Sequence, residues 1–234
     1  MKAILTKKED AAEGTMYTEF ITEEEIKFAP GQFFRLSLIN PIYTDNRGNS
    51  RFFGFINTPS QVKLAATITR NGPSAFKRSM FEALPGMEAE IDGINGNIVF
   101  SDDLDKVIVI VTGGIGVAPI MSLLRWENQE SRGHKILLIN SNTNRKRAIF
   151  LEELREYEHA IPNFKLEATM TQDPDWGGET RRIDADYLKE KINLGEDNMY
   201  YITGTPRFVP DMVKHLRGIG ADPAKMKFEI FTGY

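Results

Sequence analysis

The sequence predicts two domains: an N-terminal antiparallel β-barrel, followed by an α/β domain built on a doubly wound parallel sheet. Three observations lead to this fold class. Short β-rich runs separated by turn clusters fill the first half, a spacing typical of antiparallel barrels. Strand and helix patterns alternate in the second half, as they do around a parallel sheet. The acidic stretch 101–105 separates the two patterns, so we expect domains at residues 1–103 and 104–234.

The barrel is expected to contain four β-rich runs, at Thr15–Ile21, Gln32–Leu38, Lys63–Arg70 and Glu88–Ile91. Turn clusters at 29–31 and 45–49 separate them, because Gly, Pro, Asn and Asp favour turns. One helix is expected after Ser74, with its apolar face formed by Phe76, Met80, Phe81 and Leu84.

The second domain is expected to contain five strands, at Lys106–Thr112, Lys135–Asn140, Phe164–Met170, Met199–Thr203 and Met226–Phe231. Helical patterns lie between them, at Pro119–Asn128, Ala148–His159, Asp184–Ile192 and Arg207–Gly218. The first strand carries five consecutive β-branched residues, which is typical of a strand buried on both faces. In such a sheet, ligands bind beyond the carboxyl ends of the strands.

Composition narrows the classes of function. The chain has 234 residues and no Cys, which excludes disulfides and cysteine-ligated clusters and favours a cytoplasmic location. Basic and acidic residues are nearly balanced in both halves, so we expect no nucleic-acid partner. The run 107–124 has no charge, but three glycines and Pro119 interrupt it, so we expect no membrane span.

A glycine-rich turn, Thr112–Pro119, follows the first strand of the second domain and precedes its first helix. Glycines in such a place let the backbone approach a pyrophosphate, whose charge is stabilised by free N–H groups. A tight turn without a ligand is the alternative, because Pro119 replaces the last glycine of the G-x-G-x-x-G pattern. The carboxylate expected about 20 residues further on, which would bind a ribose hydroxyl, is missing.

Two further segments allow both a structural and a ligand-binding interpretation. Arg51–Phe55 places three aromatic rings beside an arginine. These rings are either ordinary core or a stacking surface for a flat ring system, with Arg51 paired to a phosphate. Asn71–Ser74 opens the expected helix and forms a second candidate anion site. The basic loop after Asn140 is either a solvated surface or a site for a ribose 2′-phosphate.

Six motifs, in this order, resemble those of the ferredoxin-NADP reductase superfamily, and the resemblance covers nearly the whole chain. They are Pro30–Phe33, similar to its P-G-Q-F entry strand; Arg51–Gly54, similar to its flavin motif R-x-Y-S; Asn71–Ser74, where its second flavin loop opens a helix; Thr112–Pro119, similar to its nicotinamide-nucleotide loop; Gly204–Pro206 followed by Met212, similar to C-G-P-P-x-M; and Glu229–Phe231, similar to its terminal E-x-aromatic.

The resemblance implies an enzyme that transfers hydride between NADPH or NADH and bound FAD and passes electrons to a separate acceptor. It implies flavin contacts from Arg51, Phe52, Phe53, Gly54, Asn57, Thr58, Ile68, Thr69, Gly72, Pro73, Ser74, Phe231 and Tyr234. It implies nucleotide contacts from Thr112, Gly113, Gly114, Ile115, Gly116, Asn140, Arg145, Arg147, Gly204, Thr205 and Pro206. Glu229 and Thr203 take the positions of the family's catalytic residues.

Three positions depart from the family pattern. Phe53 stands for its Tyr, Gly54 for its flavin-facing Ser and Thr203 for its Cys beside the nicotinamide. A hydrogen bond to the flavin is therefore lost or supplied by the backbone, and serine at position 54 is expected to accelerate reduction if the backbone does not fill that role. The departures also motivate a rival hypothesis, a non-catalytic subunit that binds flavin or nucleotide.

The resemblance implies a redox acceptor, because the chain holds no cluster of its own. Ferredoxin or flavodoxin is expected first, and an oxygenase component or free flavin next. We expect NADPH rather than NADH, because no carboxylate follows Asn140 while Arg145 lies in the next loop. His134, His159 and His215 have polar neighbours and no metal-ligand spacing, so we expect all three at the surface and no metal site.

Overall fold

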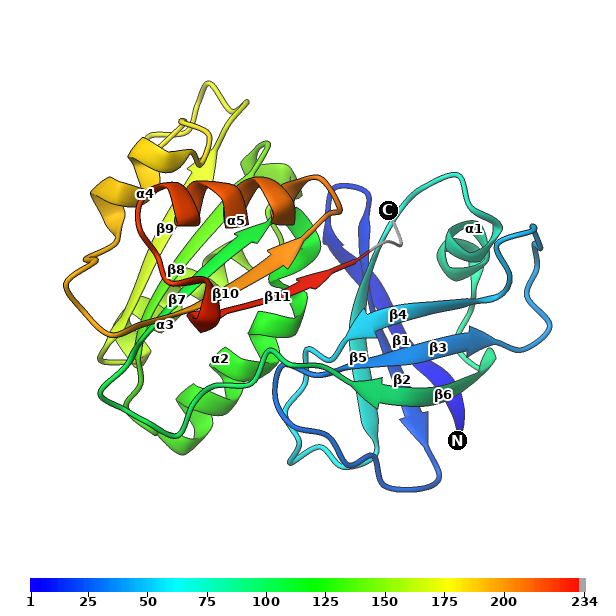
Figure 1. Cartoon of the computed structure of the whole chain (residues 1–234). Helices are drawn as coiled ribbons and strands as arrows, with labels where there is room; N and C mark the ends of the chain where they lie inside the picture. Colours follow the sequence, from blue (N-terminus) through cyan, green and yellow to red (C-terminus); the bar gives the residue numbers. More distant parts are fainter. Residues whose placement is uncertain (232–234) are drawn as a thin grey trace. The chain divides into compact units, whose positions relative to one another are not determined.

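The computed structural model describes residues 1–231, which separate into two compact units. The first unit comprises Met1–Val99 and Ala118–Trp126, and the second comprises Phe100–Val117 and the described chain from Glu127 onward. One unit contains a six-stranded antiparallel sheet and the other a five-stranded parallel sheet (Figure 1). The predicted fold class is therefore confirmed.

The antiparallel sheet is made of β1 (Lys2–Ala12), β2 (Thr15–Thr22), β3 (Phe33–Leu38), β4 (Ser50–Gly54), β5 (Leu64–Arg70) and β6 (Glu88–Asn95). Its strand order is β4-β3-β6-β1-β2-β5. Sequence patterns missed β1 and β4. In β1, Ala3 and Leu5 are buried but the distal half is charged, so its partners β2 and β6 establish the strand rather than its composition.

Helix α1 (Ala75–Glu82) is the single α-helix within the barrel sequence. The Ser74 side chain caps it by accepting a hydrogen bond from the Lys77 N–H, and Phe76 and Met80 bury its apolar face in the barrel core. At the other end, the Lys8 ammonium donates to the carbonyls of Phe81 and Ala83 at 2.8 and 2.7 Å. The assignment of Leu84 to this face is wrong: it follows the helix and is 74% exposed.

The parallel sheet contains β7 (Val107–Gly113), β8 (Lys135–Asn142), β9 (Phe164–Met170), β10 (Asn198–Gly204) and β11 (Met226–Ile230), in the order β11-β10-β7-β8-β9. The α-helices along this part of the chain are α2 (Ala118–Glu130), α3 (Leu151–Ala160), α4 (Ala185–Lys191) and α5 (Phe208–Gly218). Side chains of α4 and α5 pack on one face of the sheet, over Val109 and Val111 of β7. The β-branched run of β7 is the central strand, as its composition predicts.

The uncharged run 107–124 is divided between β7, the 3₁₀ turn η1 (Gly114–Val117) and the start of α2. Among the described residues, every helix is too short or too polar to cross a bilayer.

His134 contradicts the expectation of three surface histidines. It is fully buried, with Nδ1 2.5 Å from Glu127 Oε2 and Nε2 2.8 Å from the Ser101 carbonyl oxygen. His159 is exposed and His215 is half-buried. The polar neighbours of His134 in the sequence gave no sign of its burial, because both of its hydrogen-bond partners come from other segments of the chain.

Candidate functional site

The glycine-rich turn after β7 is shaped by close contact with β10. A Cβ added at Gly116 would lie 2.7 Å from the Thr203 carbonyl oxygen and 2.8 Å from Gly204 Cα, so a side chain there requires the backbone to move. The Thr203 hydroxyl donates to the Gly116 carbonyl at 2.7 Å. Gly114 adopts a φ of 56°, which favours glycine. The close packing of the turn therefore requires glycines. A backbone without side chains also lets a phosphate approach its N–H groups.

Phe208, the first residue of α5, lies against two of the predicted glycines. A Cβ at Gly113 would lie 2.9 Å from its Cδ2, and a Cβ at Gly204 2.7 Å from its Cδ1. Its backbone N–H donates to the Thr205 hydroxyl at 3.1 Å, which caps the start of the helix. None of the sequence motifs indicated Phe208, although an aromatic residue two positions after the 204–206 motif was the available signal.

A cavity of about 510 Å³ opens beside Phe208. The lining residues come from the carboxyl ends of β8 and β9, the segment just before α4, and α5: Ser141, Thr143, Thr171, Gln172, Arg182, Ile183, Asp184, Phe208, Asp211, Met212 and His215. Parallel sheets are expected to bind ligands at this end of the strands. Arg182, Asp184 and Asp211 supply its charged groups, together with the titratable His215.

Asn140, a predicted nucleotide contact, is engaged inside the sheet. It is buried, its amide donates to the Thr112 hydroxyl at 2.7 Å and its carbonyl oxygen accepts from Asn142 at 2.5 Å. Thr112 is likewise buried. The side chains of Asn140 and Thr112 therefore stabilise the end of β7, which leads into the turn.

Arg145 is held by Asp173 and does not line the cavity. Its Nε and Nη2 donate to the two carboxylate oxygens of Asp173 at 2.8 and 3.2 Å, and its backbone N–H donates to the same group at 3.0 Å. These hydrogen bonds lower the pKa of Asp173 to about 2. Arg147 closes the 3₁₀ turn η2 (Arg145–Arg147), where its N–H donates to the Asn144 side chain. Among the described residues, the arginine that lines the cavity is Arg182, which the sequence motifs did not indicate.

The remaining positions of the second unit cluster at the end of β10. Glu229 lies on β11 in register with Thr203, and the Phe231 N–H donates to the Gly204 carbonyl at 3.0 Å. Ile115 is half-buried within η1, and Pro206 is exposed. Tyr234 lies outside the described residues.

In the first unit, Arg51 brings a guanidinium to the start of α1. Its Nη1 donates to the carbonyls of Arg47, Gly48 and Ser50, and the group lies 5.2 Å from the Phe76 ring. Its Nη2 is buried and has no hydrogen-bond partner among the described residues. A buried donor of this kind is costly unless something accepts its hydrogen bonds.

Lys77, in the first turn of α1, is only 9% exposed. Burial lowers its pKa, and so do the charges of Arg47, Arg70 and Arg51. The charges of three arginines thus act on Lys77 beside the N-terminus of α1. Such an accumulation of positive charge is typical of an anion-binding site.

The aromatic motif divides between the two faces of β4. Phe53 is half-buried, with ring centroids 6.2 Å from Phe34 and 5.8 Å from Phe76, so the core interpretation holds for it in part. Phe52 is 55% exposed. At Gly54, an added Cβ would lie 2.8 Å from Pro119 Cβ, which leaves no room for the family's serine.

The other residues predicted to contact the flavin differ in whether their polar groups already have hydrogen-bond partners. The Asn57 side chain forms hydrogen bonds with the backbone of Leu64 and Ala66, and the Thr58 hydroxyl forms one with the Ser60 hydroxyl. Thr69 is buried, and its hydroxyl has no hydrogen-bond partner among the described residues. Ile68 is buried, Gly72 half-buried and Pro73 exposed.

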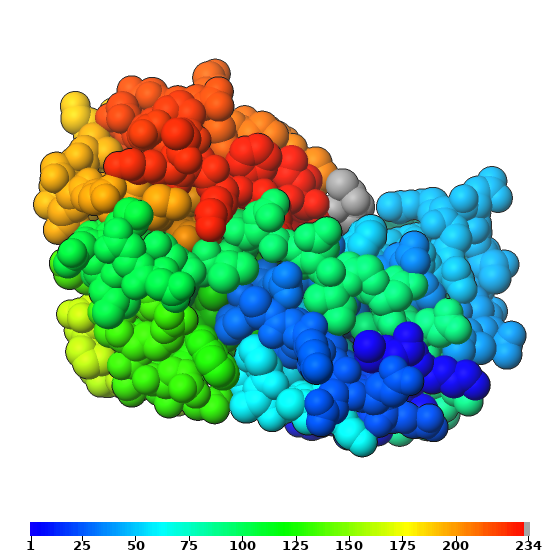
Figure 2. Space-filling model, turned by 60° about the horizontal axis from the view of Figure 1, so that its bottom comes forward, coloured from blue at the N-terminus to red at the C-terminus, as the bar shows by residue number. Residues whose placement is uncertain are grey.

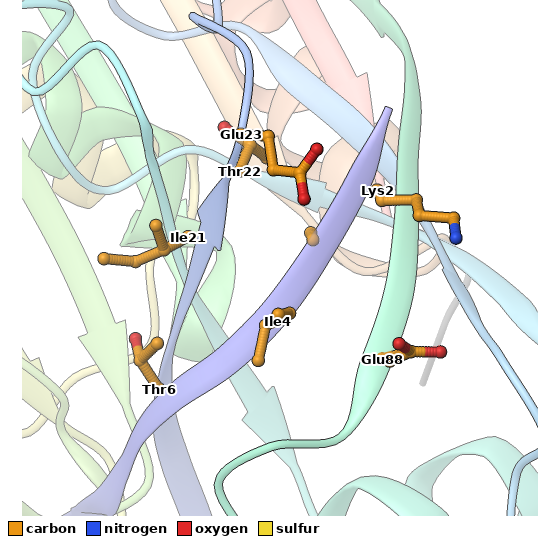
Figure 3. Close-up of a pocket in the computed structure, with 8 residues that line it drawn as sticks. Lys2, Ile4, Thr6, Ile21, Thr22, Glu23 and Glu88 are labelled. Atoms are coloured by element: carbon orange, nitrogen blue, oxygen red, sulfur yellow. The ribbon is translucent and has the colours of Figure 1, made fainter.

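A separate hollow of about 270 Å³ lies on the barrel surface, lined by Lys2, Ala3, Ile4, Thr6, Ile21, Thr22, Glu23 and Glu88 (Figure 3). Ile4 and Ile21 are cross-strand partners of β1 and β2 and are both nearly half-exposed. The hollow contains no residue that the sequence predicted for a site, so it is distinct from the candidate site.

Comparison with known proteins identifies related sequences. Residues 110–214 match the family model of the oxidoreductase NAD-binding domain. The chain is 23% identical over 211 residues to the toluate 1,2-dioxygenase electron transfer component of Pseudomonas putida, covering 89% of this chain and 60% of that protein. It is 24% identical over 244 residues to the flavohemoprotein of Rhizobium meliloti, covering 96% and 59%. The chain thus spans about six tenths of the length of these two relatives.

Solved structures share the fold over the whole chain. A cytochrome P450 reductase from Amycolatopsis superposes with a TM-score of 0.85 at 20% identity, covering 99% of this chain and 70% of that one. A ferredoxin NADP+ reductase from Neisseria gonorrhoeae, with bound FAD and NADP, superposes with a TM-score of 0.80 at 19% identity, covering 100% and 98%.

Proposed function

We propose that this chain, which resembles the ferredoxin-NADP reductase superfamily, is a reductase that uses both of its units. The first unit binds FAD, the second binds a nicotinamide dinucleotide, and electrons pass to a separate redox acceptor. The observation that carries this proposal is the buried Nη2 of Arg51 beside α1, which has no hydrogen-bond partner among the described residues.

The residues of the first unit fit the phosphates of a flavin nucleotide. Arg51 offers a buried donor without a partner among the described residues, and Lys77 adds a second cation. Thr69 offers a buried hydroxyl that is likewise unpartnered within residues 1–231. Phosphate oxygens accept charge-assisted hydrogen bonds from such donors. Phe53 would present an aromatic face to the flavin ring.

The flavin, when bound, accepts hydride and releases electrons singly or in pairs; binding and orientation are the task of the protein. In the second unit, the turn Gly113–Val117 presents backbone N–H groups to a pyrophosphate, while Phe208 supports the glycines. The cavity beside Phe208 suits the adenosine end of the dinucleotide, because it lies beyond the carboxyl ends of β8 and β9.

The charges of this cavity favour NADH over NADPH. Two acidic residues, Asp184 and Asp211, and one basic residue, Arg182, line it. Arg145, the group expected to select a 2′-phosphate, is already paired with Asp173. A 2′-phosphate would therefore meet more negative than positive charge there.

The acceptor is proposed to be a redox protein, either a ferredoxin or flavodoxin or an oxygenase component. The relative from Pseudomonas putida, named as the electron transfer component of a dioxygenase, supports the last of these.

Anaerobic addition of NADH, then NADPH, to FAD-loaded protein tests the proposal. Loss of the oxidised flavin absorbance with NADH is the expected result. Purified protein that takes up no flavin would refute the proposal. Bound flavin that neither nucleotide reduces would instead favour a non-catalytic binding subunit, in line with the departures at Gly54 and Thr203.

A further inference from the structure

The segment between β3 and β4, residues 39–49, lies against α1 (Figure 1). The Tyr43 backbone N–H donates to Ser79 Oγ at 2.9 Å, and its phenol donates to Glu82 Oε2 at 2.7 Å. The Arg78 guanidinium lies 3.8 Å from the centre of the Tyr43 ring. The tip of this segment is exposed and protrudes from the surface, in light blue in Figure 2.

This segment brings a carboxylate to the N-terminus of α1. Asp45 Oδ2 accepts a hydrogen bond from the Ala75 N–H at 2.8 Å, and its Oδ1 accepts from the Arg47 N–H at 2.9 Å. These backbone hydrogen bonds lower the pKa of Asp45, and the charges of Arg51 and Arg47 lower it further. Asp45 is therefore ionised at neutral pH and lies within electrostatic reach of Arg51.

The carboxylate and a flavin phosphate would interact with the same groups. Both are anions that accept hydrogen bonds from helix N-terminal N–H groups and from arginine. One α1 N–H is taken by Asp45 itself and another by Ser74. The buried Nη2 of Arg51 has no hydrogen-bond partner among the described residues, so a donor remains at this site for a phosphate.

We propose that Asp45 occupies part of the anion site at the start of α1 and competes there with the phosphates of the flavin, so that this residue limits the affinity of the chain for flavin nucleotides. The inference rests on the proposed function, since it presumes that this site takes flavin phosphates. In the absence of flavin, Asp45 reduces the repulsion among the basic groups. In its presence, Asp45 either withdraws from Ala75 or remains and repels the phosphate.

The variant Asp45→Asn tests the proposal, because asparagine keeps an oxygen that accepts from the Ala75 N–H but removes the charge. Affinities for FAD, FMN and riboflavin are measured by flavin fluorescence titration at low salt. We expect Asp45→Asn to bind FAD and FMN about three- to tenfold more tightly, as one removed charge near a phosphate predicts. Riboflavin has no phosphate and should bind unchanged.

The variant Glu24→Gln is the matched control, since it removes one exposed negative charge elsewhere in the same unit and should change no affinity. The gain for Asp45→Asn should shrink in high salt. Asp45→Ser, which also keeps an oxygen acceptor without the charge, provides a second readout if the asparagine variant folds poorly.

Equal or weaker binding of FAD and FMN by Asp45→Asn overturns the proposal, and so does tighter binding of all three flavins, which would indicate a general loop effect. Wild-type protein that binds no flavin at any concentration refutes the proposed function instead. The two failures are therefore distinguishable.

Discussion

Substitution of Gly54 by serine is expected to destabilise the first unit rather than restore a missing hydrogen bond. Gly54 ends β4, where a Cβ would lie 2.8 Å from Pro119 Cβ, 3.0 Å from its Cδ and 3.1 Å from its Cα. Carbon atoms in favourable contact are about 3.5 to 4.0 Å apart. Pro119 has a rigid ring near the start of α2, so the helix or the strand must move to admit a side chain.

The size of the expected destabilisation follows from the insertion of a side chain into a close contact. A side chain inserted where no space exists costs about 1 to 3 kcal/mol. For a chain of this length, each kcal/mol shifts the melting temperature by about 2 to 4 °C. Gly54→Ser should therefore melt roughly 2 to 12 °C below the wild type. Gly54→Ala should lose a similar amount, because the added bulk and not the hydroxyl causes the loss.

Thermal and urea unfolding followed by circular dichroism provide the measurement. Gly218→Ala is the control: it lies in α5, and a Cβ there meets nothing within 4 Å. It should be neutral or stabilising by up to about 1 kcal/mol. The reasoning is refuted if Gly54→Ser retains wild-type stability, and all the more so if it also accelerates reduction of bound flavin by NADH.

Three further predictions concern charged groups. Arg51→Ala should weaken FAD binding by about 10- to 100-fold, because a phosphate loses a charge-assisted partner, and unchanged retention of flavin on gel filtration would contradict this. Arg145→Ala should alter kcat/KM for NADH and NADPH to the same extent, because Arg145 stabilises its loop by a hydrogen bond to Asp173. A loss confined to NADPH would instead show that Arg145 binds a 2′-phosphate. His134→Ala should lower the free energy of unfolding by about 3 kcal/mol in urea titrations, because the buried Glu127 Oε2 loses the imidazole, and a change under 1 kcal/mol would refute the importance of that pair.

Much of the fold was predictable because its signals are local. The β-branched run of β7 and the Ser74 cap of α1 each lie within a few consecutive residues, and both elements form where expected. Strand β1 was missed because its distal half is charged on both faces, and only pairing with β2 and β6 establishes it. Leu84 was misplaced because the helix ends two residues earlier than the apolar spacing suggests.

The candidate site was predictable to a smaller degree. Motif order identified the glycine turn after β7 and Arg51 beside α1, but not Phe208, Arg182 or Lys77, which take part through packing and proximity. Cavity-lining groups from four elements have no common spacing in the sequence. Their convergence follows from the parallel sheet, whose carboxyl ends meet at one edge.

The sequence by itself determined the alternation of strands and helices in the second half of the chain, the change from a barrel to a parallel sheet and the positions of the motifs, because side-chain periodicity and turn chemistry act over a few residues. Only the tertiary structure decided which groups meet. Arg145 donates hydrogen bonds to Asp173, and the buried His134 contacts Glu127 and Ser101. Pro119 occupies the space beside Gly54, and Asp45 accepts a hydrogen bond at the start of α1. Apart from the contact between Glu127 and His134, which are seven positions apart, these contacts join residues that are brought together only by long-range packing. The partner of a charged group, which determines whether that group remains available to a ligand, is therefore a property of the folded chain.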